Sequence, residues 1–283
     1  MNLTMPTVVA TLVVALVMSP MAAGAITIFS DAGADAAAIQ DTVDAYRAAL
    51  GDPNNANNPG PLSSGRREIN WDGGGPPVID GTAPVTPFTV FQNSRGATFT
   101  TPGIGLTQAA ATGGLLSLDL INPTYADLFA AFSPNRLFTP LGSNITDGSF
   151  SIPGTGGAVP AEVRGFGAIF SDVDIQGGTT IEFIGTSGNP LGTFEVPAFT
   201  GNQTFSFLGV ITGVNEPLIG SVRIVTGTAA LGPNESSTVD LAVMDDVLYA
   251  EPQAVPEPWS FELMGLGLVA LATLRRMRPN RQA

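Results

Sequence analysis

The acidic residues of this chain include clusters whose types and spacing suit oxygen ligation of a metal ion. Asp172 and Asp174 are separated by one residue, so on a strand both carboxylates would point to one face. Asp245 and Asp246 are adjacent near the end of an apolar run, with Asp240 upstream. Because Ca²⁺ prefers oxygen ligands, these five aspartates form a candidate calcium site. Solvated or turn-capping aspartates are the alternative interpretation.

A second candidate site is the segment Asn70-Trp71-Asp72, which is followed by a glycine. An exposed Trp71 would stack on a sugar ring, and Asn70 and Asp72 would form hydrogen bonds with the sugar hydroxyls. The alternative is a Trp71 packed in the core at the end of a strand. The 16 phenylalanines of the chain are best explained as core filling.

Three glutamates, Glu162, Glu182 and Glu195, are the candidates for catalysis by paired carboxylates. Glycoside hydrolysis needs two such groups at a defined separation, which a sequence does not give. Solvent-facing positions on strands explain the same residues. A carboxylate-based glycoside hydrolase is therefore the remote alternative.

The composition excludes most other catalytic chemistry. The chain has no histidine, cysteine or lysine, so it has no Ser-His-Asp triad, thiolate nucleophile, zinc–thiolate site or Schiff-base lysine. Its net charge of −13 repels phosphate backbones, and we expect no nucleic-acid partner. We therefore expect a protein that is not an enzyme.

The segments that must position these residues are mostly short strands. Helices are predicted at 31–50, with Ser30 or Asp31 as N-cap and Gly51 at its end, and at 123–132. After the first helix, strand-like runs alternate with Gly, Pro and Asn at 67–71, 88–92, 97–100, 115–120 and 149–152. Further runs follow at 165–173, 179–185, 191–196, 204–211, 220–226 and 239–249. This pattern predicts a mainly β fold, an antiparallel jelly-roll-like β-sandwich with an N-terminal helix.

The N-terminus has the features of a secretory signal. An apolar core at 8–17 precedes the triplet Ala23-Gly24-Ala25, which fits the small-x-small cleavage rule. We expect signal peptidase to cut after Ala25. An uncleaved N-terminal anchor is the alternative.

The C-terminus has three parts in a fixed order. The proline strip Val255-Pro256-Glu257-Pro258 favours an extended backbone. An apolar segment at 259–277 is near the lower length limit of a spanning helix. The basic end at 275–281 suits the cytoplasmic side of a membrane; its arginines are Arg275, Arg276, Arg278 and Arg281.

This tail resembles the PEP-CTERM sorting signal of exported bacterial proteins. The resemblance covers about a tenth of the chain and is carried by the proline strip, the Gly265-Leu266-Gly267-Leu268 stretch and Arg275-Arg276. It implies that the tail holds the protein in the inner membrane until an exosortase cuts near the proline strip. It also implies release or attachment outside the cytoplasm, often with exopolysaccharide.

Together these features divide the chain into four parts: a signal peptide at 1–25, a helix and loop at 26–60, a sandwich body at 61–251 and a sorting tail at 252–283. We expect an exported cell-surface or extracellular-matrix protein, structural or binding rather than catalytic, that is first anchored in the membrane. A calcium-dependent carbohydrate-binding module is the alternative.

Overall fold

The computed structural model describes residues 26–73, 80–214, 216, 218–234, 236 and 238–255. The predicted signal peptide, with Ala23 and Ala25, lies outside these residues, as does the predicted C-terminal hydrophobic helix. Of the proline strip, only Val255 lies within them. In the described part of the chain, no helix is long and apolar enough to cross a membrane.

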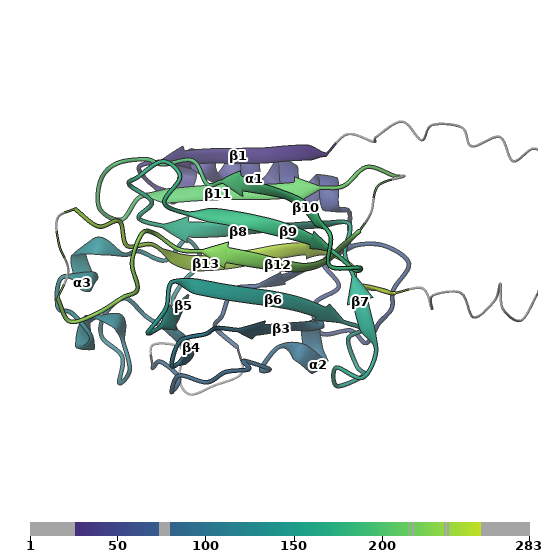
Figure 1. Ribbon diagram of the computed structural model, residues 1–283, viewed down its shortest axis with the longest axis horizontal. Helices are drawn as coiled ribbons and strands as arrows, with labels where there is room; N and C mark the ends of the chain where they lie inside the picture. Colours follow the sequence, from purple (N-terminus) through teal and green to yellow (C-terminus); the bar gives the residue numbers. More distant parts are fainter. Residues whose placement is uncertain are drawn as a thin grey trace, which may run out of the picture.

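The described residues form two antiparallel sheets, which confirms a mainly β fold consistent with a β-sandwich (Figure 1). We call them sheet A and sheet B. Sheet A has the order β1 (Thr27–Gly33), β11 (Phe205–Ile211), β8 (Gly165–Ser171), β13 (Val243–Ala250), β5 (Leu137–Leu141) and β4 (Gly105–Ala109), with β2 (Arg66–Ile69) also paired to β13. Sheet B has the order β10 (Pro190–Glu195), β9 (Thr180–Gly185), β12 (Ile219–Val225), β6 (Ile145–Ser151), β7 (Pro160–Glu162) and β14 (Gln253–Ala254), with β3 (Ala97–Thr100) also paired to β6.

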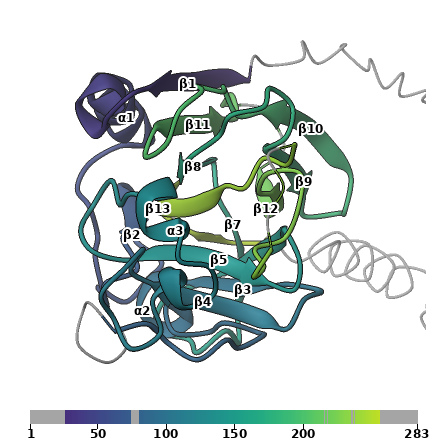
Figure 2. The same ribbon diagram turned by 90° about the vertical axis from the view of Figure 1, so that its left-hand side faces the viewer.

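Sheet A is covered on both faces. Its inner face joins sheet B in the main hydrophobic core. Helix α1 (Ala36–Leu50) packs on its outer face through Ile39, Val43 and Tyr46 (Figure 2). The segment with η1 (Leu118–Leu120) and α3 (Tyr125–Leu128) covers another part of that face. Every residue of β8 and β13 is consequently buried, as expected for strands covered on both sides.

Sheet B alternates between buried and accessible residues, as a half-covered sheet does. In β9 the buried Ile181 and Phe183 face the core, and Glu182 between them is accessible. In β12, Val222 and Ile224 are buried and Arg223 is exposed. Both strands thus have one face in the core and one face accessible. The outer face of sheet B is therefore the accessible sheet surface of the sandwich.

Helix α1 begins later than predicted. Asp35 is its N-cap and accepts a hydrogen bond from the backbone N–H of Ala38 at 3.0 Å. The helix ends at Gly51, as predicted. Asp31 instead lies in β1, which pairs along its whole length with β11. Pairing with a strand far along the chain thus outweighs the local helical pattern in these residues.

Several segments between α1 and β5 also differ from the predictions. The run 88–92 is no strand and leads into α2 (Gln92–Arg95), and 115–120 ends in the 3₁₀ turn η1. The helix predicted at 123–132 is a single turn, because Phe129 already has extended dihedral angles. From β8 onwards most of the predicted strands are confirmed to within about two residues, although β13 begins at Val243.

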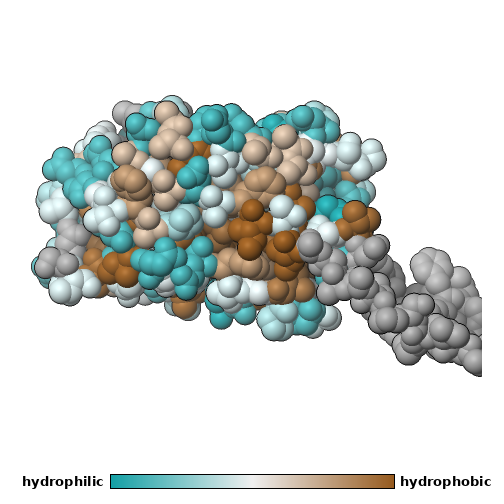
Figure 3. Space-filling view, turned by 90° about the horizontal axis from the view of Figure 1, so that it is seen from above, coloured by the Kyte–Doolittle hydropathy of each residue, from teal (hydrophilic) through white to brown (hydrophobic). Residues whose placement is uncertain are grey.

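The edge of the molecule at β1 has a mixed surface. Figure 3 views the molecule from above and shows hydrophilic and hydrophobic residues side by side. One of the accessible apolar residues at this edge is Ile28 on β1, which is 49% exposed. Single exposed apolar side chains of this kind are normal on soluble domains.

Candidate functional site

Asp172 and Asp174 do not share a strand face, which corrects the sequence-based prediction. β8 ends at Ser171, and Asp172 has a φ of +68°, so the chain turns at this point. Asp172 is buried, whereas Asp174 is half-buried. The Oδ1 atom of Asp174 accepts a hydrogen bond from the backbone N–H of Gly201 at 2.8 Å. Its carboxylate thus ties two loops together.

Asp240 also forms hydrogen bonds with the loop that contains Asp174. Its two carboxylate oxygens accept hydrogen bonds from the backbone N–H groups of Asp174 at 3.0 Å and Ile175 at 3.3 Å. Burial raises the pKa of Asp240, and the nearby charge of Asp174 adds to the rise. Asp240 therefore has the role of a loop-capping aspartate, which is the alternative stated for this cluster.

Asp245 and Asp246 form a buried carboxyl pair in β13. The register of this strand shifts between Met244 and Val247, so the two aspartates lie in a bulge. Asp245 is 0% exposed and Asp246 is 4% exposed. The backbone N–H of Phe132 donates to Oδ2 of Asp245 at 2.5 Å.

The surroundings of this pair favour sharing of a proton. Burial raises the pKa of Asp245 well above its usual range, and the charge of Asp246 raises it further. The pKa of Asp246 is also raised by burial, although hydrogen bonds from Asp245 and Ser133 and the guanidinium of Arg47 act against this. Of the two carboxyl groups, Asp245 therefore has the more strongly raised pKa and the stronger tendency to hold a proton.

Asp245→Asn is expected to make the fold more stable at pH 7 and to leave it about equally stable near pH 4. A carboxyl whose pKa is raised by folding contributes stability at low pH, and this contribution is lost as the pH rises through the folded-state pKa. Asparagine keeps a donor for Asp246 and an acceptor for Phe132 without the charge. Thermal denaturation between pH 4 and pH 8 measures the effect.

The control for this prediction is Asp41→Asn on the exposed side of α1, which makes the same carboxyl-to-amide change away from the buried pair. Arg47 and Glu68, which also act on Asp246, stay unchanged in both variants. An equal gain in both variants at pH 7 would show that overall charge, and not the buried pair, causes the effect.

The five aspartates of the candidate calcium site fall into two groups. Asp240 contacts the loop of Asp172 and Asp174, whereas Asp245 and Asp246 contact each other. Within the described ranges, no group of three or more acidic side chains is arranged to hold a metal ion. The calcium site stays a prediction without a converged set of ligands in this part of the chain.

Trp71 lies in the core, so the hypothesis that it stacks on a sugar is wrong. Its side chain is 0% exposed. It stacks on Phe138 with ring centroids 3.8 Å apart and planes 3° apart. Its Nε1–H donates to the backbone oxygen of Asp245 at 2.6 Å. The left-handed φ of +64° at Trp71 turns the chain just beyond β2, and this turn accompanies the burial of the indole.

Asn70 and Asp72, the residues on either side of Trp71, form hydrogen bonds that stabilise a turn. The Oδ1 atom of Asp72 accepts hydrogen bonds from the backbone N–H groups of Asn135 at 2.9 Å and Arg136 at 3.1 Å. The amide of Asn70 donates to the other oxygen of Asp72 at 3.3 Å. With Trp71 buried, Asn70-Trp71-Asp72 does not form the expected sugar platform.

The three candidate glutamates lie on different strands of sheet B. Glu162 is on β7, and partial burial raises its pKa. Glu182 on β9 is in register with Arg223 on one side and Thr193 on the other. Glu195 at the end of β10 accepts a hydrogen bond from Gln176 at 2.7 Å. Each has a structural environment of its own, and none lines the groove described next.

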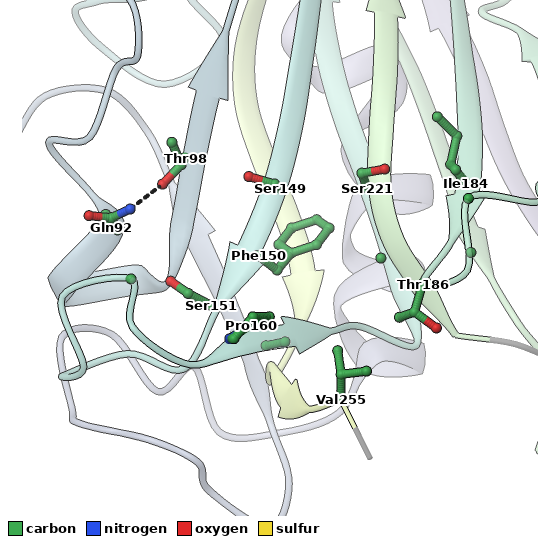
Figure 4. A pocket seen from close by; sticks show the side chains of 15 residues that line it. Gln92, Thr98, Ser149, Phe150, Ser151, Pro160, Ile184, Thr186, Ser221 and Val255 are labelled. Atoms are coloured by element: carbon green, nitrogen blue, oxygen red, sulfur yellow. Dashed lines mark hydrogen bonds between the residues drawn. The ribbon is translucent and has the colours of Figure 1, made fainter. Parts of the chain in front are cut away.

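A groove of about 450 Å³ lies on the accessible face of sheet B (Figure 4). Thr98, Ser149 and Ser221 lie in one row across β3, β6 and β12, because they are paired residues in the strand register. Ile184 on β9 continues the row. We call this the hydroxyl groove.

The ends of the hydroxyl groove come from loops and from the C-terminal part of the body. Pro160 on β7 and Val255 lie at one end (Figure 4). The loop after β9 comes close to β12 at Thr186. If position 220 carried a Cβ atom, that atom would lie only 2.8 Å from the Cα atom of Thr186. Glycine at position 220 thus allows this loop to approach β12.

The amino-acid sequence alone does not reveal this groove. Its residues are serine, threonine and glycine, which are common on any strand surface, and only the register brings them together. The available signal was that Ser149 and Ser221 each lie in a predicted strand.

Comparison with known proteins gives no family. No protein-family profile matches the sequence, and no curated protein matches it. The fold is distantly similar to the crystal structure of the enzymatically active domain of tailspike protein 4 of bacteriophage CBA120, with 15% sequence identity and a TM-score of 0.27. The match covers 61% of this chain and 21% of that chain, and likeness at this level carries no functional argument.

Proposed function

We propose that this chain is an exported cell-surface or extracellular-matrix protein whose jelly-roll-like body has a structural or binding role and whose tail is a PEP-CTERM sorting signal. The observation that carries the proposal is that the chain is still paired with sheet B at the first residue of the proline strip. β14 pairs with β7, and the backbone N–H of Val255 donates to the oxygen of Pro160 at 3.2 Å. Val255 is also the first residue of the proline strip, so the body and the sorting motif meet at this residue.

A buried ion pair supports this division of the chain. Glu251, four residues before Val255, binds Arg67 with an Nε–Oε2 distance of 2.7 Å, and the two side chains are 0% and 2% exposed. This contact fixes the end of β13 to β2 inside the body. Proteolysis beyond Val255 would leave this contact and the pairing of β14 intact, as release of a folded body requires.

The character of the hydroxyl groove supports a binding role over a catalytic one. Its lining, as far as the structure describes it, contains no Asp, Glu or Arg side chain. Acid–base or nucleophilic catalysis in a chain without histidine, cysteine and lysine relies on carboxylates, tyrosine or arginine, and the described lining contains none of these. A groove of neutral hydroxyl groups suits recognition instead.

Protein recovered from the native host is expected to begin at Ile26 and to end near Pro258. Signal peptidase would remove residues 1–25, and an exosortase-type enzyme would remove the tail after inner-membrane retention by Arg275, Arg276 and Arg278. Intact mass spectrometry measures both ends in one experiment.

Replacing both Pro256 and Pro258 with alanine is the matched test of the motif, and Pro233→Ala, at an exposed loop position, is its control. The double variant is expected to retain Arg281, whereas the control is processed normally. A wild-type product that retains Arg281 would contradict the sorting proposal and make the tail a permanent anchor.

A further inference from the structure

The hydroxyl groove contains a buried hydroxyl group that has no hydrogen-bond partner within the described part of the chain. Ser151 lines the groove and is 6% exposed. Its Oγ atom has no hydrogen-bond partner among the described residues. Buried polar atoms are nearly always paired, so an orphan hydroxyl at the wall of a groove points to a partner supplied by a ligand.

The remaining polar groups of the groove are neutral and act as both donors and acceptors. Ser149 is exposed and Ser221 is half-buried. The amide of Gln92 donates to Oγ1 of Thr98 at 2.9 Å, which leaves the Thr98 hydroxyl proton for another acceptor. Hydroxyl groups can donate and accept, so this row matches a ligand that also carries many hydroxyl groups.

The charged side chains of the neighbouring rung of sheet B lie outside the groove. One rung further along the sheet, Arg223 binds Asp147 with distances of 2.7 and 3.0 Å. Glu182 on β9 lies in register with Arg223 on its other side. None of these three side chains lines the groove. The lining of the groove, in the part of the chain that the structure describes, therefore offers no charge to neutralise an anionic or cationic ligand.

Small apolar surfaces complete the groove. Pro160, Ile184 and Val255 contribute C–H groups beside the row of hydroxyl groups (Figure 4). Sugar rings present hydroxyl groups at their rims and C–H groups on their faces, and this pattern matches the lining. The volume of about 450 Å³ lies within the range of roughly 300–1,000 Å³ of small-ligand sites.

We propose that the hydroxyl groove of sheet B binds a segment of a neutral polysaccharide, without calcium, through Thr98, Ser149, Ser151 and Ser221. The proposal deepens the proposed function and rests on it in one respect, because an exported body would meet such polymers outside the cell. The binding itself does not depend on how the chain is processed.

The test is affinity electrophoresis of protein purified from the native host, with its termini recorded by mass spectrometry. The gels contain glucomannan, xyloglucan or dextran as neutral polymers and alginate as an anionic polymer. The protein is expected to be retarded by at least one neutral polymer, to the same extent with and without EDTA, and not by alginate. Because termini and binding are measured separately, failed processing and failed binding are distinguishable.

Two groove variants and one control locate the binding. Ser149→Trp fills the groove and is expected to abolish the retardation, whereas Ser30→Trp, at an exposed serine of β1 on the other sheet, leaves it unchanged. Ser151→Ala is expected to weaken retardation without lowering the melting temperature, because its hydroxyl has no partner in the described protein. This second variant keeps the test informative if Ser149→Trp does not fold.

Three results would overturn the proposal. One is the absence of retardation by every neutral polymer, and another is equal retardation of Ser149→Trp, Ser151→Ala and the wild type. The third is retardation that EDTA removes, which would place the site at acidic residues outside the groove. Saturable binding of a synthetic peptide of residues 254–262, with no retardation by polysaccharide, would make the groove a peptide site.

Discussion

Glu251→Gln is expected to lower the free energy of unfolding by about 3–5 kcal/mol, the typical cost of breaking one side of a buried ion pair. The carboxylate binds Arg67 through two hydrogen bonds, Nε to Oε2 at 2.7 Å and Nη2 to Oε1 at 2.8 Å. Both side chains are almost fully buried. Glutamine keeps the shape but leaves the Arg67 charge without a counterion.

The same carboxylate organises the loop between α1 and β2. The amide of Asn55 donates to its Oε2 atom at 2.8 Å, and the backbone N–H of Leu62 donates to Oε1 at 3.2 Å. Arg67 also donates to the backbone oxygen of Ala56 at 2.8 Å. Charge-assisted hydrogen bonds of this kind are among the stronger ones, so we expect the loop to loosen together with the ion pair.

Asp147→Asn is the matched control, because Asp147 makes the same two-bond contact with Arg223 on the surface of sheet B. These side chains are 36% and 50% exposed, and an exposed pair contributes only about 0.2–1 kcal/mol. Urea denaturation of both variants measures the difference. Equal losses in the two variants would contradict a special role for burial, and Arg67→Met combined with Glu251→Met should recover part of the stability.

Strands β9, β10 and β12 of sheet B could be predicted because their sequence signals are local. The alternation around Glu182 and Arg223 reports a half-covered strand, and Ser187-Gly188-Asn189 marks the turn between β9 and β10. This turn is closed by a hydrogen bond of 2.8 Å from the backbone N–H of Gly185 to the oxygen of Asn189. Such signals lie within a few residues of each other, so they are readable without knowledge of the sheet.

The features that could not be predicted depend on pairing between distant segments. β1 owes its conformation to β11, which lies more than 170 residues further along the chain. The bulge that buries Asp245 and Asp246 depends on how β13 meets β8. The hydroxyl groove likewise needs the register that brings Ser149 opposite Ser221. Local sequence patterns indicate which side of a strand is accessible to solvent, but they do not indicate which strand lies next to it in the sheet.

Trp71→Ala is expected to lower the free energy of unfolding by about 3–5 kcal/mol, as for other large-to-small changes of buried aromatic residues. The indole contacts the rings of Phe88, Phe91 and Phe99 edge-on, besides its stack on Phe138. The collapse of such a site is limited because rings from several segments surround it. The loss of the Nε1–H bond also leaves the backbone oxygen of Asp245 without this donor.

Trp71→Phe separates packing from hydrogen bonding. Phenylalanine can keep the stack on Phe138 but cannot donate to Asp245, so its loss of stability should be smaller than that of Trp71→Ala. Urea denaturation followed by circular dichroism measures both variants without relying on the removed fluorophore. A Trp71→Ala protein as stable as the wild type, with weakened binding to polysaccharide, would contradict the buried position and restore the sugar-stacking hypothesis. The expected result is the reverse, with stability lowered and the hydroxyl groove still able to bind in the folded fraction.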